Sequence, residues 1–97
     1  MLIDYSTPYV IEKDNVAGLH FPTEEVLESP EEIKQRSTDA QRGMLLGNND
    51  KGKVKILFID DEGVKQVETT IWAVTDTRVI LKTGMGIPLH RILKVKI

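Results

Sequence analysis

The clearest pattern in the chain is the alternation of apolar and polar residues in its C-terminal half. In residues 53–60, the side chains of Val54, Ile56 and Phe58 fall on one face of an extended segment. Similar short apolar segments follow at residues 64–74, 78–82, 87–90 and 93–97. Turn residues such as Gly, Asp and Thr separate these segments. The pattern therefore predicts roughly five antiparallel strands joined by tight turns.

The longest segment, residues 64–74, changes its alternation part-way and contains the only Trp of the chain. Ile71 falls on one side of this segment, and Trp72 falls on the other. A long strand that changes its buried face bends or bulges, as the strands of small barrels do. We therefore predict a small, strongly bent, roughly five-stranded antiparallel barrel, which hides its edges by closing. Ile71 and Val79 are expected in its core, whereas Trp72 is either a core residue or an exposed platform.

A single amphipathic helix is predicted over residues 29–46. Ser29 suits the N-cap, Pro30 suits the first helical position, and a Glu at the third position can reach back to the cap. Gly47 and the two Asn residues after it form a stop signal. The apolar positions make a narrow stripe on one face of the helix, formed by Ile33, Ala40 and Met44.

The chain is 97 residues long, which is enough for one domain. Residues 1–28 are predicted to form an N-terminal arm that packs on the domain. Residues 29–97 are predicted to form that domain, with the helix at 29–46 and the barrel at 53–97. The fold class is α+β and mainly β. Residues 19–22, Leu-His-Phe-Pro, either fasten the arm to the core or form a docking surface for a partner.

Composition excludes several classes of protein. The chain has no Cys, which excludes disulfides, thiolate nucleophiles, zinc ribbons and iron–sulfur clusters. Its N-terminus has neither a basic region nor an apolar core of the kind found in signal peptides. Its apolar runs are far shorter than the ~20 residues that cross a bilayer. We therefore expect a cytoplasmic protein that makes no contact with membranes.

Charge is unevenly distributed along the chain. Residues 1–47 contain four Lys or Arg and nine Asp or Glu, a net charge of −5. Residues 48–97 contain nine Lys or Arg and six Asp or Glu, a net charge of +3. The two halves either attract each other, within one molecule or between two, or form two separate solvated faces.

The sequence contains no recognisable catalytic motif. His20 and His90 lie in unrelated segments, without a partner at metal-ligand spacing. The acidic triplet of Asp60, Asp61 and Glu62 is typical of a solvated hairpin tip, with weak cation binding as the alternative. We therefore expect a protein that is not an enzyme, with no catalytic residue, no cofactor and no metal site.

A nucleic-acid-binding surface is the alternative that the charged residues raise. Lysines alternate along the first and the last predicted strands of the barrel, which are neighbours if the barrel closes. The Trp side chain is the best candidate for stacking on a base. The candidate contact residues, for nucleic acid or for another partner, are Lys51, Lys53, Lys55, Arg78, Lys82, Arg91, Lys94, Lys96 and Trp72. Lysines on exposed strands also serve simply to prevent aggregation between sheet edges.

The order of these segments resembles the Sm-like family of small β-barrels over Lys53–Ile97. A helix precedes the strands, and the long bent strand leads through a short turn at Asp76 into the next strand. A glycine-containing loop then leads to Ile-Pro-Leu-His-Arg-Ile at residues 87–92 and to a last short strand. The resemblance implies a small barrel, and such barrels often bind RNA or other proteins, sometimes as rings. Residues 69–76 are also similar to a stretch of small uncharacterised bacterial proteins, which implies no activity.

The function expected from the sequence is that of an interaction module. The expected partner is an unknown protein or a second copy of the chain, and Met44, Leu45 and Leu46 are candidates for the apolar contact. The alternative is the binding of RNA or of single-stranded nucleic acid through a lysine-lined face. The position of Trp72 discriminates between them, because a buried Trp removes the best stacking residue.

Overall fold

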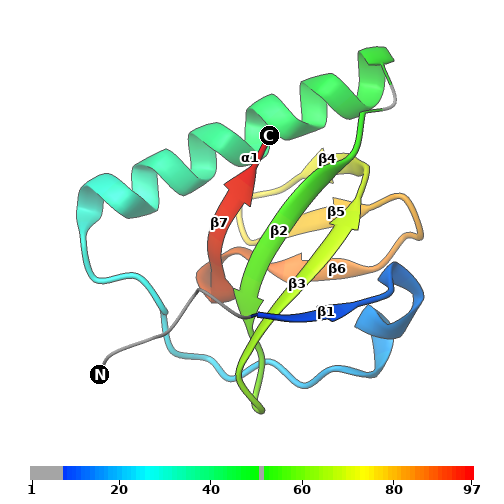
Figure 1. Ribbon diagram of the computed structural model, residues 1–97. Coiled ribbons are helices and arrows are strands. Elements are labelled where there is room, and N and C mark those ends of the chain that lie inside the picture. Colours follow the sequence, from blue (N-terminus) through cyan, green and yellow to red (C-terminus); the bar gives the residue numbers. More distant parts are fainter. Residues whose placement is uncertain (1–7, 51) are drawn as a thin grey trace.

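The computed structural model describes residues 8–50 and 52–97 as a mixed α+β fold that is mainly β (Figure 1). This is the class that the sequence predicted. The strands are β1 (Tyr9–Ile11), β2 (Val54–Ile59), β3 (Val64–Thr69), β4 (Ile71–Val74), β5 (Arg78–Leu81), β6 (Gly86–Pro88) and β7 (Ile92–Lys96). The helices are the α-helix α1 (Pro30–Asp50) and the short 3-10 helices η1 (Lys13–Gly18) and η2 (Leu89–Arg91).

The strands form two sheets. The four-stranded sheet has the order β1-β3-β2-β7, and the three-stranded sheet has the order β4-β5-β6. β1 runs parallel to β3, and the other neighbouring pairs are antiparallel. Within residues 8–50 and 52–97 there are seven strands where the sequence predicted five, and no closed barrel is found. The predicted barrel is therefore not confirmed.

Thr70 is the point at which the long segment 64–74 passes from one sheet to the other. β3 ends at Thr69, and β4 begins at Ile71. The amide of Lys82 donates a hydrogen bond of 3.0 Å to the carbonyl oxygen of Thr70, which ties the bend to the end of β5. The bend that the changing alternation predicted is present. Its consequence is a change of sheet, because the segment pairs with β2 before the bend and with β5 after it.

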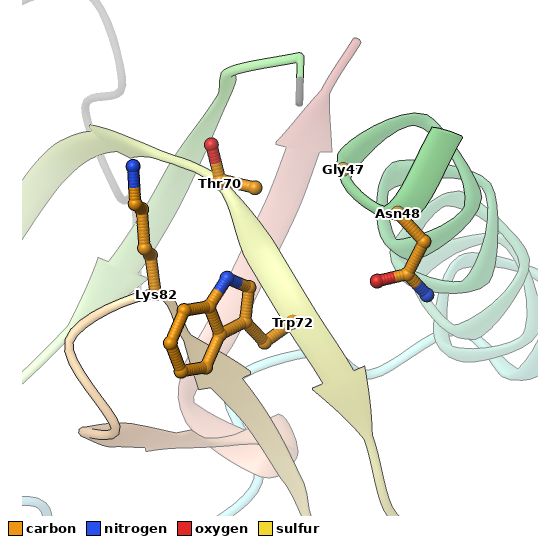
Figure 2. A pocket seen from close by; sticks show the side chains of 5 residues that line it. All are labelled: Gly47, Asn48, Thr70, Trp72 and Lys82. Atoms are coloured by element: carbon orange, nitrogen blue, oxygen red, sulfur yellow. The ribbon is translucent and has the colours of Figure 1, made fainter. Parts of the chain in front are cut away.

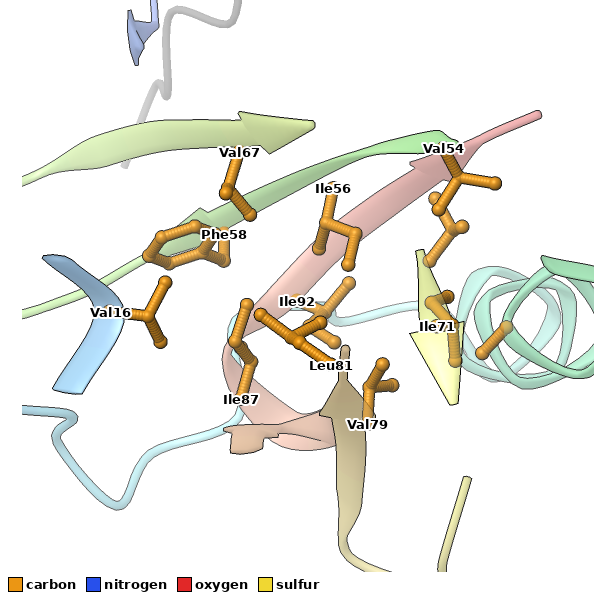
Figure 3. Packing of buried hydrophobic residues seen from close by; sticks show 12 residues of the cluster. Val16, Val54, Ile56, Phe58, Val67, Ile71, Val79, Leu81, Ile87 and Ile92 are labelled. Carbon is orange, nitrogen blue, oxygen red and sulfur yellow. The ribbon is translucent and has the colours of Figure 1, made fainter. Parts of the chain in front are cut away.

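The core lies between the two sheets. Figure 3 shows apolar side chains from β2, β3 and β7 meeting those from β4, β5 and β6, with Val16 of η1 at one end. Ile71 and Val79 are both fully buried, as the sequence predicted. Phe21 from the N-terminal part packs on Phe58, with ring centroids 5.9 Å apart. Branched aliphatic residues dominate this core because the chain has few aromatic side chains.

Helix α1 packs against β7 and β4, which are terminal strands of the two sheets (Figure 1). It begins as predicted: the amide of Glu32 donates to the Ser29 hydroxyl at 3.4 Å, and Pro30 is the first helical residue. The buried stripe includes Ala40, as predicted, while Ile33 and Met44 are half-buried. The helix therefore covers the line along which the two sheets separate.

The helix does not stop at Leu46, as the sequence predicted, but continues to Asp50. Gly47 serves close packing instead: a Cβ atom placed on it would lie 2.5 Å from the carbonyl oxygen of Ile71. A Cβ atom on Gly43, one turn earlier, would lie 3.0 Å from the Ile71 side chain. A glycine that permits close contact cannot be distinguished from a helix-ending glycine by local sequence alone.

The described part of the N-terminal segment runs along both sheets. β1 pairs with β3, and Leu27 packs in a second apolar cluster with Leu57 and Leu93 on the four-stranded sheet. The amide of Val26 donates to the carbonyl oxygen of His90 at 3.0 Å. The division into an arm at 1–28 and a domain at 29–97 stays a prediction, and residues 1–7 of that arm lie outside the described residues.

We expect Gly47→Ala to destabilise the fold by about 1–2 kcal/mol. Alanine gains about 1 kcal/mol of helix propensity over glycine. Overpacking costs about 1–3 kcal/mol, and the upper part of this range, about 2–3 kcal/mol, applies here because the added methyl group meets the backbone of β4, which cannot move cheaply. Urea unfolding followed by circular dichroism measures the difference.

The matched control is Gly18→Ala. An added Cβ atom there meets no heavy atom within 4 Å, and we expect no loss of stability. A Gly47→Ala variant as stable as the wild type would show that the helix moves away from β4 without cost.

Candidate functional site

Trp72 lies at a β-bulge between β4 and β5. Ile71 is opposite Leu81, but Ala73 is opposite Ile80, so that Trp72 is the extra residue on its strand. Alternation along the strand directs the Trp72 side chain to the side opposite Ile71. The Trp72 side chain is 52% exposed, whereas Ile71 before it is fully buried. The structure thus decides between the two positions that the sequence left open, and Trp72 is exposed.

The outer face of the three-stranded sheet carries Trp72 together with basic residues from β5 and its end. Val79 and Leu81 point into the core, and the alternate positions Arg78, Ile80 and Lys82 point outward. We call Trp72, Arg78, Ile80 and Lys82 the Trp72 face. None of the three strands contains an acidic residue, so the charges on this face are those of Arg78 and Lys82.

A pocket of about 310 Å³ adjoins the Trp72 face at the bend between the sheets. Its lining residues are Gly47, Asn48, Thr70, Trp72 and Lys82. Figure 2 shows the indole ring and the Lys82 side chain on one side of β4, and the last turns of α1 on the other. The pocket is therefore bounded by the sheet, the bend and the end of the helix.

The candidate lysines on the four-stranded sheet form a separate group. β2 and β7 are neighbours, as expected for the first and last strands of the predicted barrel, and Lys55 is opposite Lys96. Lys94 is opposite Leu57, and these three lysines are exposed. Glu68 of β3 lies on the other side of Lys55, and Glu32 and Asp39 of α1 line a pocket with Lys94, so acidic residues adjoin this group.

The structure therefore divides the nine candidate residues. Trp72, Arg78 and Lys82 share the three-stranded sheet, and the lysines of β2 and β7 share the four-stranded sheet. Lys53 is exposed just before β2. Lys51 lies outside the described residues.

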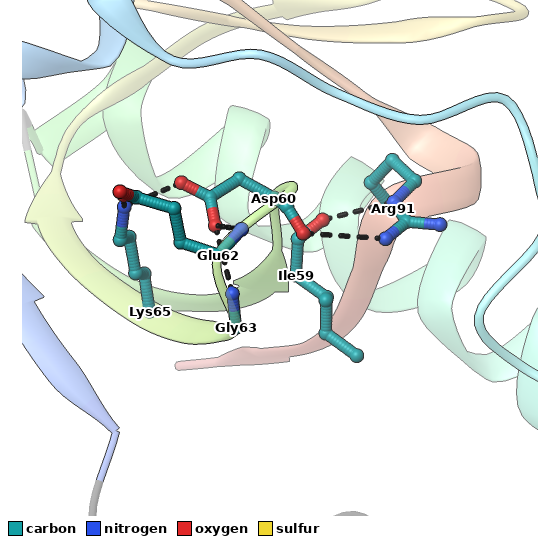
Figure 4. A network of polar contacts seen from close by, with 6 residues as sticks. All are labelled: Ile59, Asp60, Glu62, Gly63, Lys65 and Arg91. Atoms are coloured by element: carbon teal, nitrogen blue, oxygen red, sulfur yellow. Dashed lines mark hydrogen bonds and ion pairs between the residues drawn. The ribbon is translucent and has the colours of Figure 1, made fainter.

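Arg91 is buried and acts as an internal cross-link. Its Nε donates to the carbonyl oxygen of Ile59 at 2.9 Å (Figure 4). Its Nη1 donates to the carbonyl oxygen of Glu24 at 2.7 Å. Its Nη2 lies 3.5 Å from the carbonyl oxygen of Asp60. The guanidinium thus joins the end of β2, the N-terminal segment and η2, and Arg91 is not part of the Trp72 face.

The acidic triplet is organised around Lys65. The buried carboxylate of Asp60 accepts hydrogen bonds from the amides of Glu62 at 2.8 Å and Gly63 at 3.1 Å, and it pairs with the Lys65 ammonium (Figure 4). Gly63 has φ = 148°, a backbone conformation that favours glycine at this turn. The Lys65 ammonium also pairs with Glu62 at 2.7 Å, so a side chain of the protein supplies the positive charge here.

A second ion pair, between the buried Arg36 and the partly exposed Glu25, joins α1 to the N-terminal segment. The Nη1 and Nη2 atoms of Arg36 donate to the two carboxylate oxygens of Glu25 at 2.7 and 2.6 Å. Nη1 also donates to the carbonyl oxygen of Ile92 at 3.0 Å. Such a bidentate pair is geometrically specific. The sequence signal for this ion pair is the position of Arg36 on the buried stripe of the helix, between Ile33 and Ala40.

Sequence reasoning missed three residues of the pocket, namely Gly47, Asn48 and Thr70. The sequence pattern predicted that Gly47 and Asn48 end the helix and that Thr70 lies in the middle of one long strand. The sequence signal that could have identified them is a residue that does not suit its predicted element. Gly47 lies at the end of the apolar stripe of the helix, and Thr70 lies where the strand changes its buried face.

Three carboxyl groups have lowered pKa values, those of Asp60, Glu25 and the exposed Glu31, and the first two belong to ion pairs. Burial raises the pKa of Asp60, but the hydrogen bonds from Lys65 and from two backbone amides outweigh this effect and leave the pKa below its ordinary value. Burial likewise raises the pKa of Glu25, and the hydrogen bonds from Arg36 and from backbone amides lower it by more. Both groups therefore favour the charged form in the folded state.

No protein-family model, no curated protein sequence and no solved structure matches this chain. No helix within residues 8–50 and 52–97 is long and apolar enough to cross a membrane. The Sm-like resemblance and the cytoplasmic location stay predictions.

We expect the free energy of unfolding to decrease as the pH falls below about 4.5. A carboxyl group whose pKa is lowered by folding stabilises the fold above its unfolded pKa, which is 4.5 for Glu25 and 3.8 for Asp60. This stabilisation is lost as the pH falls through the lower folded value. Urea unfolding at a series of pH values between 7 and 2 measures the loss.

Asp60→Asn should lose about 1–3 kcal/mol at pH 7, because it removes the charged partner of Lys65 and weakens the turn. Its stability should also depend less on pH in the acid range. The neighbouring exposed Asp61→Asn is the matched control and should behave as the wild type does. If Asp60→Asn and the wild type lost stability equally in acid, the acid sensitivity could not be assigned to Asp60.

Proposed function

We propose that this protein is a non-enzymatic binding module that holds single-stranded nucleic acid on the Trp72 face. The observation that carries the proposal is the exposure of Trp72 at a bulge, beside Lys82 and on a face without acidic residues. Aromatic platforms flanked by cations are the common means of binding single strands without strict sequence preference.

Each residue of the Trp72 face has a role in this proposal. The indole ring stacks on a base, an interaction worth about 1–3 kcal/mol. Arg78 and Lys82 are four residues apart on an extended strand, about 13 Å, and contact phosphates on either side of the stacked base. Ile80 lies between them and adds apolar contact with the sugar and base.

The negative net charge of the chain does not oppose this binding strongly. Charges on exposed residues are screened beyond about 10 Å at 0.1 M salt. The nine acidic residues of residues 1–47 produce the excess of negative charge, whereas the strands of the Trp72 face contain none. The strands of the face therefore add only positive charge to the local potential, and the acidic residue next to them in sequence is Asp76 of the β4–β5 turn.

We also propose that the two sheets act together as one small, incompletely closed barrel. The bend at Thr70 connects β3 to β4, and η2 connects β6 to β7, so that the chain passes twice between the sheets. Partly open barrels of five strands are known platforms for oligonucleotides. The Sm-like resemblance of residues 53–97 supports the same architecture.

Self-association is the second candidate function. β1 is a terminal strand of its sheet, and Tyr9 and Val10 on it are 70% and 67% exposed. An edge strand with exposed apolar residues is a template for pairing with a second chain. Leu45 on the outer side of α1 is also 56% exposed and offers further apolar contact.

The intrinsic fluorescence of Trp72 tests the nucleic-acid proposal directly, since the chain has no other Trp. We expect single-stranded DNA and RNA oligonucleotides to quench it at about 50 mM salt, and the affinity to fall as salt rises. With a labelled oligonucleotide, Trp72→Ala should bind about tenfold more weakly. Trp72→Phe, which retains a ring, should lose much less.

The double variant Arg78→Ala/Lys82→Ala should bind more weakly and lose about 1.4 from the slope of log affinity against log salt. Lys34→Ala/Arg42→Ala is the matched control, because it removes one Lys and one Arg from exposed positions on α1. The absence of quenching and of binding at about 50 mM salt would refute the proposal.

Light scattering after size-exclusion chromatography tests self-association. We expect the apparent mass to rise with protein concentration, and Val10→Lys to suppress the rise by placing a charge on the edge strand. Lys13→Ala is a control near β1 that leaves the exposed apolar pair intact. A strict monomer at all concentrations excludes this candidate.

A further inference from the structure

The pocket beside Trp72 has room for one nucleobase. Its volume of about 310 Å³ is at the lower limit of ligand sites, which range from about 300 to 1,000 Å³. Gly47 makes this geometry possible, since its lack of a side chain brings the end of α1 against β4. As a result, Asn48 on the helix and Trp72 on the strand line the same cavity.

The two sides of the pocket differ in polarity. The last four carbonyl groups of an α-helix lack partners within the helix, and the helix dipole is negative at that end. Gly47 and Asn48 belong to this last turn of α1. On the sheet side, the Lys82 ammonium provides positive charge (Figure 2). A ligand with hydrogen-bond donors at one end and an anionic group at the other matches both sides.

We propose that the pocket receives one adenine base of the bound strand and that the Asn48 carboxamide recognises its edge. This inference rests on the proposed function and names the base that the same site prefers. Asn pairs with the adjacent donor and acceptor of adenine through two hydrogen bonds. The phosphate of the same nucleotide then lies toward Lys82, and the Thr70 hydroxyl borders the pocket between them.

The other bases fit the two sides less well. Guanine and uracil or thymine present carbonyl oxygens where adenine has its amino group, and these oxygens are repelled by the carbonyl end of α1. Cytosine has an amino group, but its single ring covers less of the indole than a purine does. Adenine alone combines an amino group with a two-ring face.

Quenching of Trp72 fluorescence in titrations with oligonucleotides of adenine, cytosine or thymine measures the preference. Each oligonucleotide has about twelve nucleotides, roughly three times the smallest single-strand binding site. We expect the adenine strand to bind about tenfold more tightly than the thymine strand. Asn48→Ala should abolish most of this preference and leave affinity for the thymine strand within about twofold. Gln41→Ala, another exposed amide on α1, is the matched control.

A change in the ligand provides a test that does not depend on a variant. An oligonucleotide with purine bases that lack the 6-amino group keeps the two-ring face and has no repelled oxygen, and we expect its affinity to fall below that of the adenine strand but to stay above that of the thymine strand. Equal affinities of wild type for adenine and thymine strands, or an unchanged preference in Asn48→Ala, would overturn the inference alone. Failure of every oligonucleotide to bind would overturn the proposed function and this inference with it.

Discussion

The close approach of α1 to the backbone of β4 is the constraint on which the rest of the structure depends. Neither Gly43 nor Gly47 has a side chain that would hold the helix away from the strand that contains Ile71. The helix can therefore cover the terminal strands of both sheets and seal the core where the sheets separate. Covering these edges also keeps them from pairing with other chains. The same contact places the end of the helix beside Trp72, so packing and the candidate site share one cause.

Local pattern was sufficient to predict the elements that depend only on nearby residues. The alternation around Ile56 predicted β2, and Ser29 predicted the start of α1. The changing alternation of residues 64–74 predicted a bend. What the bend does, a transfer between sheets at Thr70, depends on which strands lie on either side, and that is not a local property.

The candidate site was harder to predict for the same reason. Whether Trp72 is buried depends on which face of the segment 64–74 is covered after the bend at Thr70, because Ile71 and Trp72 lie on opposite faces and only one of them can enter the core. Gly47 has the same local sequence as a helix stop, and only its distance from Ile71 explains it. Arg91 was grouped with exposed cations, although the structure directs its guanidinium to three backbone carbonyl groups. Distant contacts decide each of these cases.

The parallel pairing of β1 with β3 has a consequence for the order of folding. Tyr9 lies opposite Lys65, and the whole of α1 and β2 falls between them in the sequence. Closing so long a loop costs chain entropy, while the hairpins of β2–β3 and β4–β5 close over a few residues. We therefore expect the hairpins to form early and β1 to dock last. We expect the same strand to be the first part of the sheet to detach in local unfolding, which would expose β3 while the core remains intact.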